Sequence, residues 1–251
     1  MMSTEIKTAL VLGDIHIPYQ DRRTMAAVHE LMKDHHWDHI VQIGDLVDLD
    51  CISSHNDGKP GIVAGKTLAA DFAEANAELD RWQKLCPEAT IAYCQGNHEA
   101  RIERLIEKIP QLKGTIEIPH LLRLKERGIK WVPYWEKDEL YRIGNLYFGH
   151  GRYTNTYHAK TMVSNYGCSI VYGHLHEVCS FSQVLKGPGK TLSAECIGCL
   201  CEYNQSYLKG AATKWQQAVM TVDFFPNGQY CALTHRIFDH RFTYNGKVYA
   251  G

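Results

Sequence analysis

The stretch that decides the fold is Tyr93-Cys94-Gln95-Gly96-Asn97-His98-Glu99. Residues 90–95 lead into it and are typical of a buried β-strand. Gly96 allows a tight exit from that strand, because a residue without Cβ can take backbone angles that are closed to other residues. Three polar side chains follow at the carboxyl end of the strand, and residues 100–108 are predicted as a helix. Such side chains can bind metal or transfer protons, so this strand end is a candidate site.

Two similar strands precede this stretch, at residues 8–13 and 39–44. Their continuous apolar runs are typical of strands that are buried on both faces. A helix that begins after Asp21 and ends near His35 lies between them, and residues 67–85 form the clearest amphipathic helix of the chain. This alternation predicts parallel strands with right-handed crossovers, and ligands gather at the carboxyl ends of such strands.

The second half of the chain is richer in strands. A loop is expected from Asp50 to about Gly65, and short basic helices are expected between residues 100 and 130. Further strands are then predicted over residues 139–148 as a hairpin, 168–172, 178–186, 191–197, 217–225 and 230–238. We expect one domain over residues 1–251, with a second and mostly antiparallel sheet.

The composition is that of an ordinary globular protein, with 45% hydrophobic and 22% charged residues. The net charge of -1 argues against a generally basic nucleic-acid binder and leaves room for a local basic patch. We find no signal peptide and no apolar run near the ~20 residues that a membrane helix needs. The nine cysteines lack the spacing of a secreted scaffold, so a cytoplasmic protein with free thiols is expected.

Five polar clusters each follow an apolar run. They are Asp14/His16, Asp45/Asp48, Asn97/His98, His150 and His174/His176. Carboxylate, imidazole and amide ligands suit two borderline divalent ions, with Mn²⁺ expected and Fe²⁺, Zn²⁺, Ni²⁺ or Co²⁺ as alternatives. Two such ions ~3.5–4 Å apart can bind a phosphate and share an activated water.

These clusters belong to five motifs in a fixed order. They read Gly13-Asp14-Ile15-His16, Gly44-Asp45-Leu46-Val47-Asp48, Gly96-Asn97-His98-Glu99, Gly149-His150 and Gly173-His174-Leu175-His176. In this the sequence resembles the calcineurin-like metallophosphoesterase superfamily, whose pattern is D-x-H, G-D-x-x-D, G-N-H-[DE], H and G-H-x-H. The resemblance implies an α/β fold, a four-layer α/β/β/α sandwich of two mixed sheets flanked by helices.

The resemblance also implies a role for each motif residue. Asp14, His16 and His176 would hold a first metal, Asn97, His150 and His174 a second, and Asp45 would bridge both. A hydroxide that bridges the metals would attack the phosphorus in line. His98 would act as general acid for the leaving oxygen or stabilise the transition state, and the Asp48 carboxylate would orient it. Histidine suits this proton transfer because its pKa lies near neutral pH.

The expected substrate is a phosphorylated small molecule, a nucleotide or a nucleic acid. Ile17, Leu49 and Asp50 depart from the Ser/Thr phosphoprotein phosphatases, and the best resemblance is to compact phosphoesterases of bacteria and phages. Such an enzyme would hydrolyse phosphodiesters or phosphomonoesters, and we favour a small nucleotide-like diester. Asn97 could also donate its NH₂ to a phosphate oxygen. Further substrate contacts are sought among the basic and aromatic residues near the motifs, namely Arg101, Arg152, His55, Tyr153, His158 and Lys160.

Two other functions stay open at this stage. One is a DNA or RNA nuclease on the same metal site, with a groove along the basic residues of 101–130. The other is a non-catalytic module that binds a partner, although such a module would be expected to have lost metal ligands, and all seven are present. The oligomeric state is left open.

Two further features have no firm role. Cys196-Ile197-Gly198-Cys199-Leu200-Cys201 suggests a zinc or iron–sulfur site, but a second C-x-x-C pair is missing, and buried free thiols are favoured. Glu99 is left without an assigned role, with capping of the helix at 100–108 as one reading.

Overall fold

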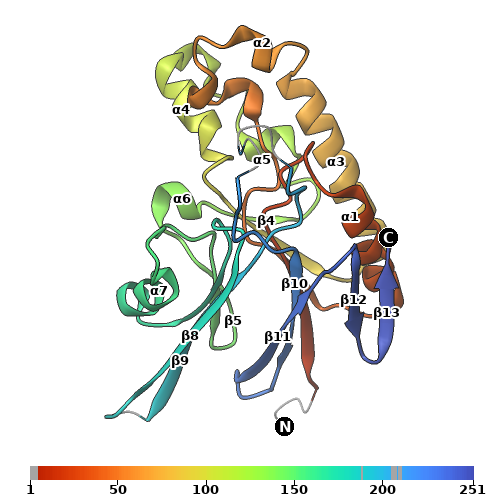
Figure 1. The fold of residues 1–251 in the computed structure, drawn as a ribbon, viewed down its shortest axis with the longest axis vertical. Coiled ribbons are helices and arrows are strands. Elements are labelled where there is room, and N and C mark those ends of the chain that lie inside the picture. Colours follow the sequence, from red (N-terminus) through yellow and green to blue (C-terminus); the bar gives the residue numbers. More distant parts are fainter. Residues whose placement is uncertain (1–4, 188, 205–207, 209–210) are drawn as a thin grey trace.

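Two β-sheets form the centre of the molecule, and helices cover their outer faces (Figure 1). The computed structural model describes residues 5–187, 189–204, 208 and 211–251. The predicted α/β class with two mixed sheets flanked by helices is confirmed.

The first sheet has the strand order β11-β10-β1-β2-β3-β4. Its strands are β1 (Lys7–Leu12), β2 (His39–Gln42), β3 (Thr90–Cys94), β4 (Lys130–Val132), β10 (Ala218–Phe224) and β11 (Tyr230–Arg236). β1 to β4 pair in parallel, as the strand–helix alternation predicts. β10 and β11 add two antiparallel pairings at the β1 edge.

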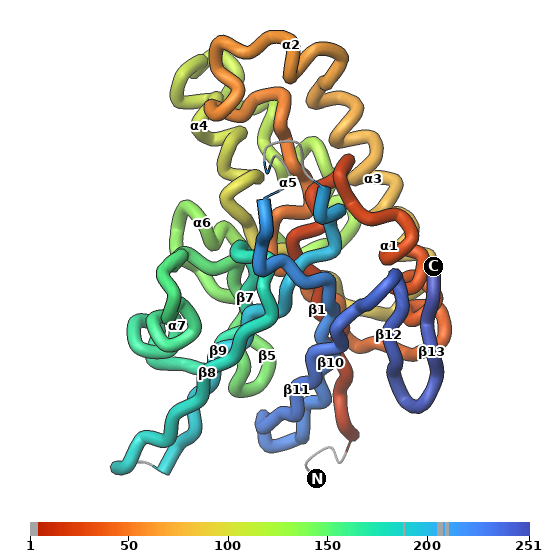
Figure 2. The backbone as a smooth tube through the Cα atoms, in the orientation of Figure 1, coloured from red at the N-terminus to blue at the C-terminus, as the bar shows by residue number. Residues whose placement is uncertain are grey.

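The second sheet has the order β5-β6-β7-β9-β8. Its strands are β5 (Tyr141–Ile143), β6 (Leu146–Phe148), β7 (Ser169–Tyr172), β8 (Val178–Leu185) and β9 (Lys190–Ile197). The β5–β6 and β8–β9 pairs are antiparallel, whereas β6–β7 and β7–β9 are parallel. Figure 2 traces β8 and β9 as a long hairpin that extends beyond the rest of this sheet.

The expectation of a mostly antiparallel second sheet is wrong, because two of its four strand pairings are parallel. The strands at 217–225 and 230–238 join the first sheet as β10 and β11. The edge of β1 opposite β2 offers free backbone groups, and β10 pairs along it from Lys7↔Phe224 to Val11↔Met220. Pairing of buried backbone groups therefore decides which sheet receives these strands.

Side-chain alternation along the strands creates the layers. Leu10, Leu12 and Ile40 face the helices α1 (Arg22–Asp34) and α3 (Leu68–Leu85). Their neighbours in the first sheet share a second core with side chains of the second sheet, including Val11, Val41, Phe148 and Val171. On the far side, Ile170 and Tyr172 of β7 pack against α7 (His158–Tyr166). The order is therefore helix, sheet, sheet, helix.

The helix boundaries follow local sequence signals. Asp21 caps α1, as predicted, because its carboxylate accepts hydrogen bonds from the backbone N–H groups of Arg23 and Thr24. Thr67 caps α3 in the same way. Helix α4 (Ala100–Lys108) follows β3 directly, as the opening stretch predicts.

Several elements have no clear signal in the sequence. The region expected as a loop forms the short turns η1 (Asp50–Ile52), η2 (Ser54–Asn56) and α2 (Pro60–Val63). The other additions are α6 (Tyr134–Lys137) and the hairpin β12 (Arg241–Tyr244)–β13 (Lys247–Ala250), whereas η3 (Pro110–Leu112) and α5 (Ile118–Leu121) lie where short helices are expected. The hairpin lies beside α1 (Figure 2), where Arg23 donates to the carbonyl oxygen of Gly251. None of the helices within the described residues has both the length and the apolarity needed to cross a bilayer.

Candidate metal centre

The candidate ligands lie at the carboxyl ends of strands from both sheets. Asp14 and His16 follow β1, Asp45 follows β2, Asn97 follows β3, His150 follows β6, and His174 and His176 follow β7. The parallel pairings bring these ends to one edge of each sheet. The two edges meet, since His16 of the first sheet contacts His176 of the second.

The backbone of most ligands is left-handed. Five of the seven have φ between 51° and 75°, namely Asp14, His16, Asp45, His174 and His176. Side chains with a Cβ adopt this region at a cost of about 1–3 kcal/mol each, and such strain clusters at functional sites. Five of the eleven described non-glycine residues with a left-handed backbone are thus candidate ligands.

Two glycines permit the close approach of neighbouring motifs. A Cβ on Gly96 would lie 2.1 Å from Asp45 Oδ1, and a Cβ on Gly173 would lie 2.0 Å from Asp14 Oδ2. Any side chain at either position would displace a candidate ligand. The glycines of these motifs thus serve packing around the two carboxylates.

The first ligand group contains Asp14, His16 and His176. His176 Nε2 lies 3.1 Å from Asp14 Oδ1, and His16 Nε2 lies 3.8 Å from the same oxygen. The two Nε2 atoms are 3.0 Å apart. Three buried donor atoms therefore converge on one point.

The second ligand group contains Asp45, His150 and His174. His150 Nε2 lies 3.1 Å from Asp45 Oδ2 and 2.9 Å from Asn97 Oδ1. Asn97 thus presents its amide oxygen to this group, which completes the four residues that the sequence assigns to a second metal and its bridge.

Asp45 lies between the two groups. Its Oδ2 is 3.1 Å from His150 Nε2 and 3.7 Å from His16 Nε2, while its Oδ1 accepts a hydrogen bond from the backbone N–H of His98. One carboxylate therefore faces both groups, which is the geometry that a bridging ligand needs.

The outward nitrogens of two ligand histidines are held by hydrogen bonds. His16 Nδ1 contacts Asp48 Oδ2 at 3.0 Å, and His150 Nδ1 donates to the carbonyl oxygen of Ile43 at 3.0 Å. These bonds place the proton on Nδ1 and leave the Nε2 lone pair free for a metal.

The charges of the site suit cations. Burial would raise the pKa of Asp45, but the facing histidines, His150 first, hold it well below its ordinary value. Burial and the adjacent His150 lower the pKa of His174 to about 4, so this ring is neutral at pH 7 and able to bind metal. Burial alone would lower the pKa of His176, whereas Cys201 and Asp14 raise it to about 9, so a cation that binds this ring must displace a proton. The donor set of carboxylates, imidazoles and one amide fits two borderline divalent ions.

His98 lies at the edge of the ligand groups. Its Nδ1 donates to the main-chain oxygen of Asp48 at 2.9 Å and lies 3.3 Å from the Asp48 carboxylate. Its Nε2 lies 3.9 Å from Asp45 Oδ2 and 3.3 Å from an Arg101 guanidinium nitrogen. Asp48 thus contacts His98 chiefly through its backbone, and its carboxylate makes the shorter contact with His16.

A model of the calcineurin-like phosphoesterases matches residues 7–178, more than half of the chain. The chain belongs to the calcineurin-like phosphoesterase family. All five motifs lie within the matched residues.

The chain is also similar to two phage proteins and to the fold of a solved structure. The gene 54 proteins of Mycobacterium phages L5 and D29 are 26% and 24% identical over 234 residues, which cover 86% of this chain and 89% of each relative. Vps29 of Chaetomium thermophilum has a similar fold, with a TM-score of 0.51 and 9% identity over 98% of this chain and 96% of that one. At this identity the likeness extends to the fold alone.

Glu99 has a role that sequence reasoning missed. This fully buried carboxylate accepts hydrogen bonds from the backbone N–H groups of Asp45, Leu46 and Gly96 at 2.7–3.0 Å. The Tyr93 hydroxyl donates a further bond of 2.6 Å. Glu99 makes no side-chain cap of α4, so the capping expectation is wrong. Its partners near Asp45 lie more than 50 positions away, which is why no local pattern indicates this role.

Arg152 lies against the aromatic residues Tyr134 and Trp135 at the start of α6. Its guanidinium donates to the carbonyl oxygens of Tyr134 and Trp135 and packs on both rings. The Trp135 ring lies 5.5 Å from the ring of His174. The described contacts of Arg152 therefore hold Trp135 beside a ligand histidine.

Three of the remaining candidates separate into two sets. His55 and Arg101 line one cavity with Asn97. His158 is instead buried and bonded to Tyr172 and Glu177, as a structural histidine would be.

The cysteine run is divided by the fold. Cys199 and Cys201 lie near His176, whereas Cys196 contacts the carbonyl oxygen of Gly173. The hydrogen bond with Cys199 and burial raise the pKa of the Cys201 thiol well above its ordinary value. The Cys201 thiol is therefore protonated at pH 7, which accords with packing rather than with a thiolate ligand of a tetrahedral metal site.

Proposed function

We propose that this chain hydrolyses phosphodiesters or phosphomonoesters at a two-metal centre, with a small nucleotide-like diester as the favoured substrate. The observation that carries the proposal is the position of Asp45 Oδ2 between the His16 and His150 groups. A non-catalytic module would have no need to keep these seven ligands in this arrangement, six of which are buried or have a left-handed backbone.

In this proposal Asp14, His16 and His176 hold one ion, and Asn97, His150 and His174 hold the other. The bound ions, Mn²⁺ in the first instance, would supply Lewis acidity toward the phosphate and an activated water. Asp45 faces both ligand groups and would hold both ions.

The protein contributes the proton. His98 Nε2 points toward Asp45 Oδ2, the side where the substrate phosphate would lie, and from there it donates a proton to the leaving oxygen. The Asp48 carbonyl oxygen fixes the ring through Nδ1. Arg101 also donates to that carbonyl oxygen at 2.7 Å, so it braces the same loop while its second nitrogen stays beside Nε2.

Turnover assays test the proposal. With Mn²⁺, the protein should hydrolyse bis-p-nitrophenyl phosphate faster than p-nitrophenyl phosphate, and a chelator should abolish both activities. An absence of turnover with every divalent ion tried would contradict the proposal.

A nuclease on the same centre is the second candidate. It is favoured by the basic side chains of α4 that lie beside Asn97. Single- and double-stranded DNA should then be cleaved, and Asp45→Asn should abolish the cleavage. Inert polynucleotides alongside an active small diester would exclude it.

A further inference from the structure

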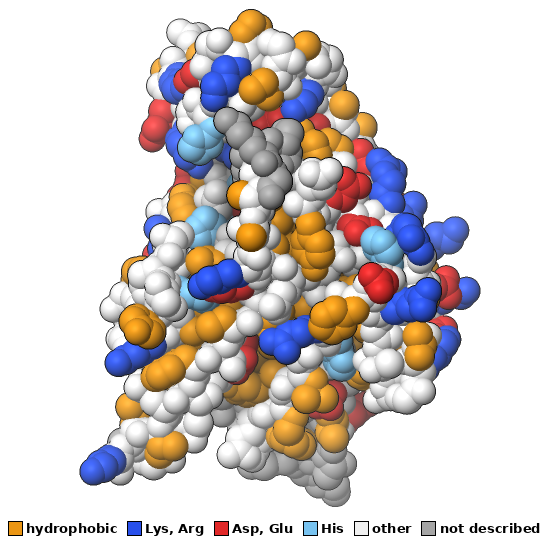
Figure 3. All heavy atoms as spheres, viewed as in Figure 1, with side chains coloured by type: hydrophobic (Ala, Val, Ile, Leu, Met, Phe, Trp, Pro, Cys, Tyr) orange, Lys and Arg blue, Asp and Glu red, His pale blue; other side chains and the backbone are white. Residues whose placement is uncertain are grey.

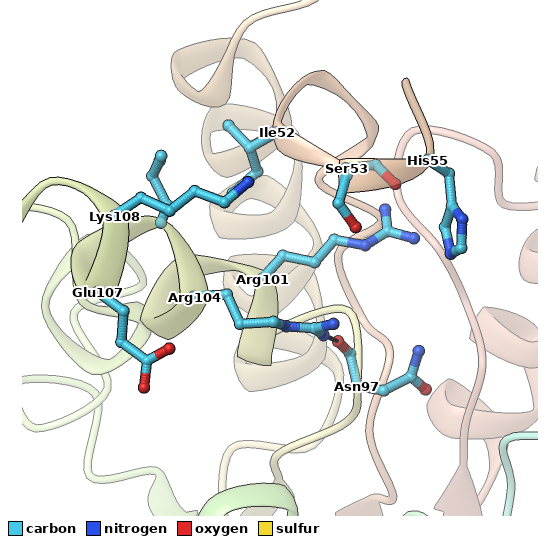
Figure 4. Close-up of a pocket in the computed structure, with 10 residues that line it drawn as sticks. Ile52, Ser53, His55, Asn97, Arg101, Arg104, Glu107 and Lys108 are labelled. Atoms are coloured by element: carbon cyan, nitrogen blue, oxygen red, sulfur yellow. Dashed lines mark hydrogen bonds between the residues drawn. The ribbon is translucent and has the colours of Figure 1, made fainter. Parts of the chain in front are cut away.

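A cavity of about 410 Å³ adjoins the metal centre. It lies between the 52–55 segment and α4 (Figure 4), and one of its lining residues, Asn97, also contacts His150 of the second ligand group. Its volume lies within the range of small-molecule sites, and it exceeds what one phosphate fills. The sequence motifs account for Asn97 and for no other part of its lining.

The lining is rich in cations. Arg101, Arg104 and Lys108 extend into it from successive turns of α4, and His55 enters from the opposite side (Figure 4). Among the described lining residues, Glu107 is the sole carboxylate, and Figure 4 shows it pointing away from Arg101. Lys and Arg side chains also gather on the upper part of the face in Figure 3, over α2 and α4.

Arg101 is paired with the Asp48 carboxylate at 3.4 Å, whereas Arg104 and Lys108 are oriented without a strong ion pair. Arg104 donates to the main-chain oxygens of Asn97 and Ala100 at 2.6 and 3.2 Å, which fixes its guanidinium and leaves its charge uncompensated by those bonds. Lys108 lies 3.6 Å from Asp57, but its side chain is 61% exposed, so that pair is weak. An anion in the cavity would meet donors that are already oriented.

The cavity lies on the leaving-group side of the centre. His98 supplies the proton to the leaving oxygen in the proposed function, and Arg101 NH2 lies 3.3 Å from His98 Nε2. A substituent that departs past His98 therefore passes Arg101 and enters the cavity. The first group that it meets is cationic.

We propose that this cavity binds a second phosphate of the substrate, carried by the leaving group. The substrate class is thus a phosphodiester with another phosphate about one nucleotide from the scissile phosphorus, as in an oligonucleotide or a terminally phosphorylated dinucleotide. This inference rests on the proposed function for its reaction. The binding of the second phosphate can be measured without turnover.

A dinucleotide comparison tests the inference by activity. Thymidylyl-thymidine is assayed with Mn²⁺ against its 5′-phosphorylated and 3′-phosphorylated forms. One phosphorylated form should have a kcat/KM about tenfold above that of the unphosphorylated compound, as one charge-assisted contact gives. Equal kcat/KM values for all three compounds would overturn the inference.

Two variants identify the cavity as the source of the preference. Arg104→Gln should reduce the tenfold ratio to near one, because it removes the cation nearest to Asn97. Lys108→Gln should reduce the ratio of kcat/KM values about threefold. Lys108 makes no described hydrogen bond to the Asn97 loop, so this change should not disturb the candidate metal ligand Asn97. Lys113→Gln, an exposed lysine that is not part of the lining, should leave the ratio unchanged. A ratio that survives both cavity variants would contradict the proposal.

Binding separates failure of this inference from failure of the proposed function. Titration calorimetry compares thymidine 3′,5′-bisphosphate with thymidine 5′-monophosphate on the Mn²⁺-loaded protein. The wild type should bind the bisphosphate about tenfold more tightly, and the Arg104→Gln/Lys108→Gln variant should bind both alike. If the wild type binds the bisphosphate and the monophosphate with equal affinity, the inference is overturned, even if the protein hydrolyses the diesters. If the wild type prefers the bisphosphate and the variant does not, the inference is supported, even if the diesters are not hydrolysed.

Discussion

The ligand cluster and the cationic cavity lie side by side and are built in opposite ways. In the cluster, Asp14, Asp45 and His150 are at most 1% exposed, and most ligands have strained backbones. In the cavity, Arg104, Lys108 and His55 are exposed and project from a helix face and from short turns. Burial and strain demand particular residues at particular positions, whereas an exposed basic surface can be made by many sequences. The comparison suggests that the cluster fixes the reaction and the cavity selects the substrate.

The largest effect is expected for Asp45→Asn within the cluster. Asp45 faces both ligand groups, so its loss should remove at least one ion and lower kcat/KM by more than the ~10³-fold that loss of one stabilising donor costs. Elemental analysis and bis-p-nitrophenyl phosphate turnover measure the two effects. Asp223→Asn, the same change at an exposed site, should alter neither. Full metal content and activity in Asp45→Asn would contradict the claim that the ligand cluster fixes the reaction.

His98→Ala tests the boundary between the two regions. It should keep both ions and lower kcat by ~10²–10⁴ on esters with poor leaving groups, because only these need a proton from the protein. The kcat on esters of p-nitrophenol, which is a good leaving group, should fall much less. The control is His36→Ala, whose side chain is 64% exposed in the wild type. Equal losses on good and poor leaving groups would contradict the role of His98 as a general acid.

Glu99→Gln should show that the cluster depends on a scaffold behind it. In the wild type, the Glu99 carboxylate accepts hydrogen bonds from backbone N–H groups. The NH₂ group of the glutamine would face some of these donors, so we expect a loss of about 3 kcal/mol in the free energy of unfolding. Tyr93→Phe, which removes one bond to the same carboxylate, should cost about 1 kcal/mol.

Urea unfolding with a chelator present measures these losses without a contribution from bound ions. Glu88→Gln is the exposed control. A change in Glu99→Gln no larger than in this control would show that the hydrogen bonds to Glu99 do not support the loop.

The smallest effect is expected behind the cavity, at Glu103 on the buried side of α4. Burial, with lesser repulsion from Glu136 and Glu99, raises the pKa of Glu103 to about 7, and Arg104 offsets part of this. One carboxylate oxygen has no hydrogen-bond partner. The folded state thus binds a proton more tightly than the unfolded state, so this residue's contribution to stability falls as pH rises from 4.5 to 7.

Glu103→Gln should remove that loss. The difference in free energy of unfolding between Glu103→Gln and the wild type should shift in favour of the variant by about 1 kcal/mol between pH 4 and pH 8. This value is reduced because the Glu103 side chain is partly exposed. Denaturation at a series of pH values measures it, with Glu126→Gln as the exposed control. A constant difference across this range would mean that Glu103 titrates normally.

The sequence predicted the elements whose signals are local. Each of the strands β1, β2 and β3 is a short apolar run that ends near a Gly and a polar ligand, so the strands and their site residues could be predicted together. Asp21 and Thr67 likewise mark helix starts by their own side chains.

The features that were missed depend on distant partners. Which sheet receives β10 is decided by the free edge of β1, more than 200 positions away. The role of Glu99 depends on the backbone of the Asp45 loop, and that of Arg152 on Tyr134 and Trp135. The sequence singles out His55 and Arg101 as possible contacts, but that the 52–55 segment and α4 enclose one cavity depends on the fold. Such features follow from the assembled fold and not from any one stretch of chain.

The central claim is that two ions share Asp45. Anomalous diffraction from crystals grown with Mn²⁺ tests it most directly. We predict two peaks ~3.5–4 Å apart, one beside Asp14, His16 and His176 and the other beside Asn97, His150 and His174, with Asp45 between them. A single peak, or peaks located instead at His176, Cys199 and Cys201, would contradict the claim.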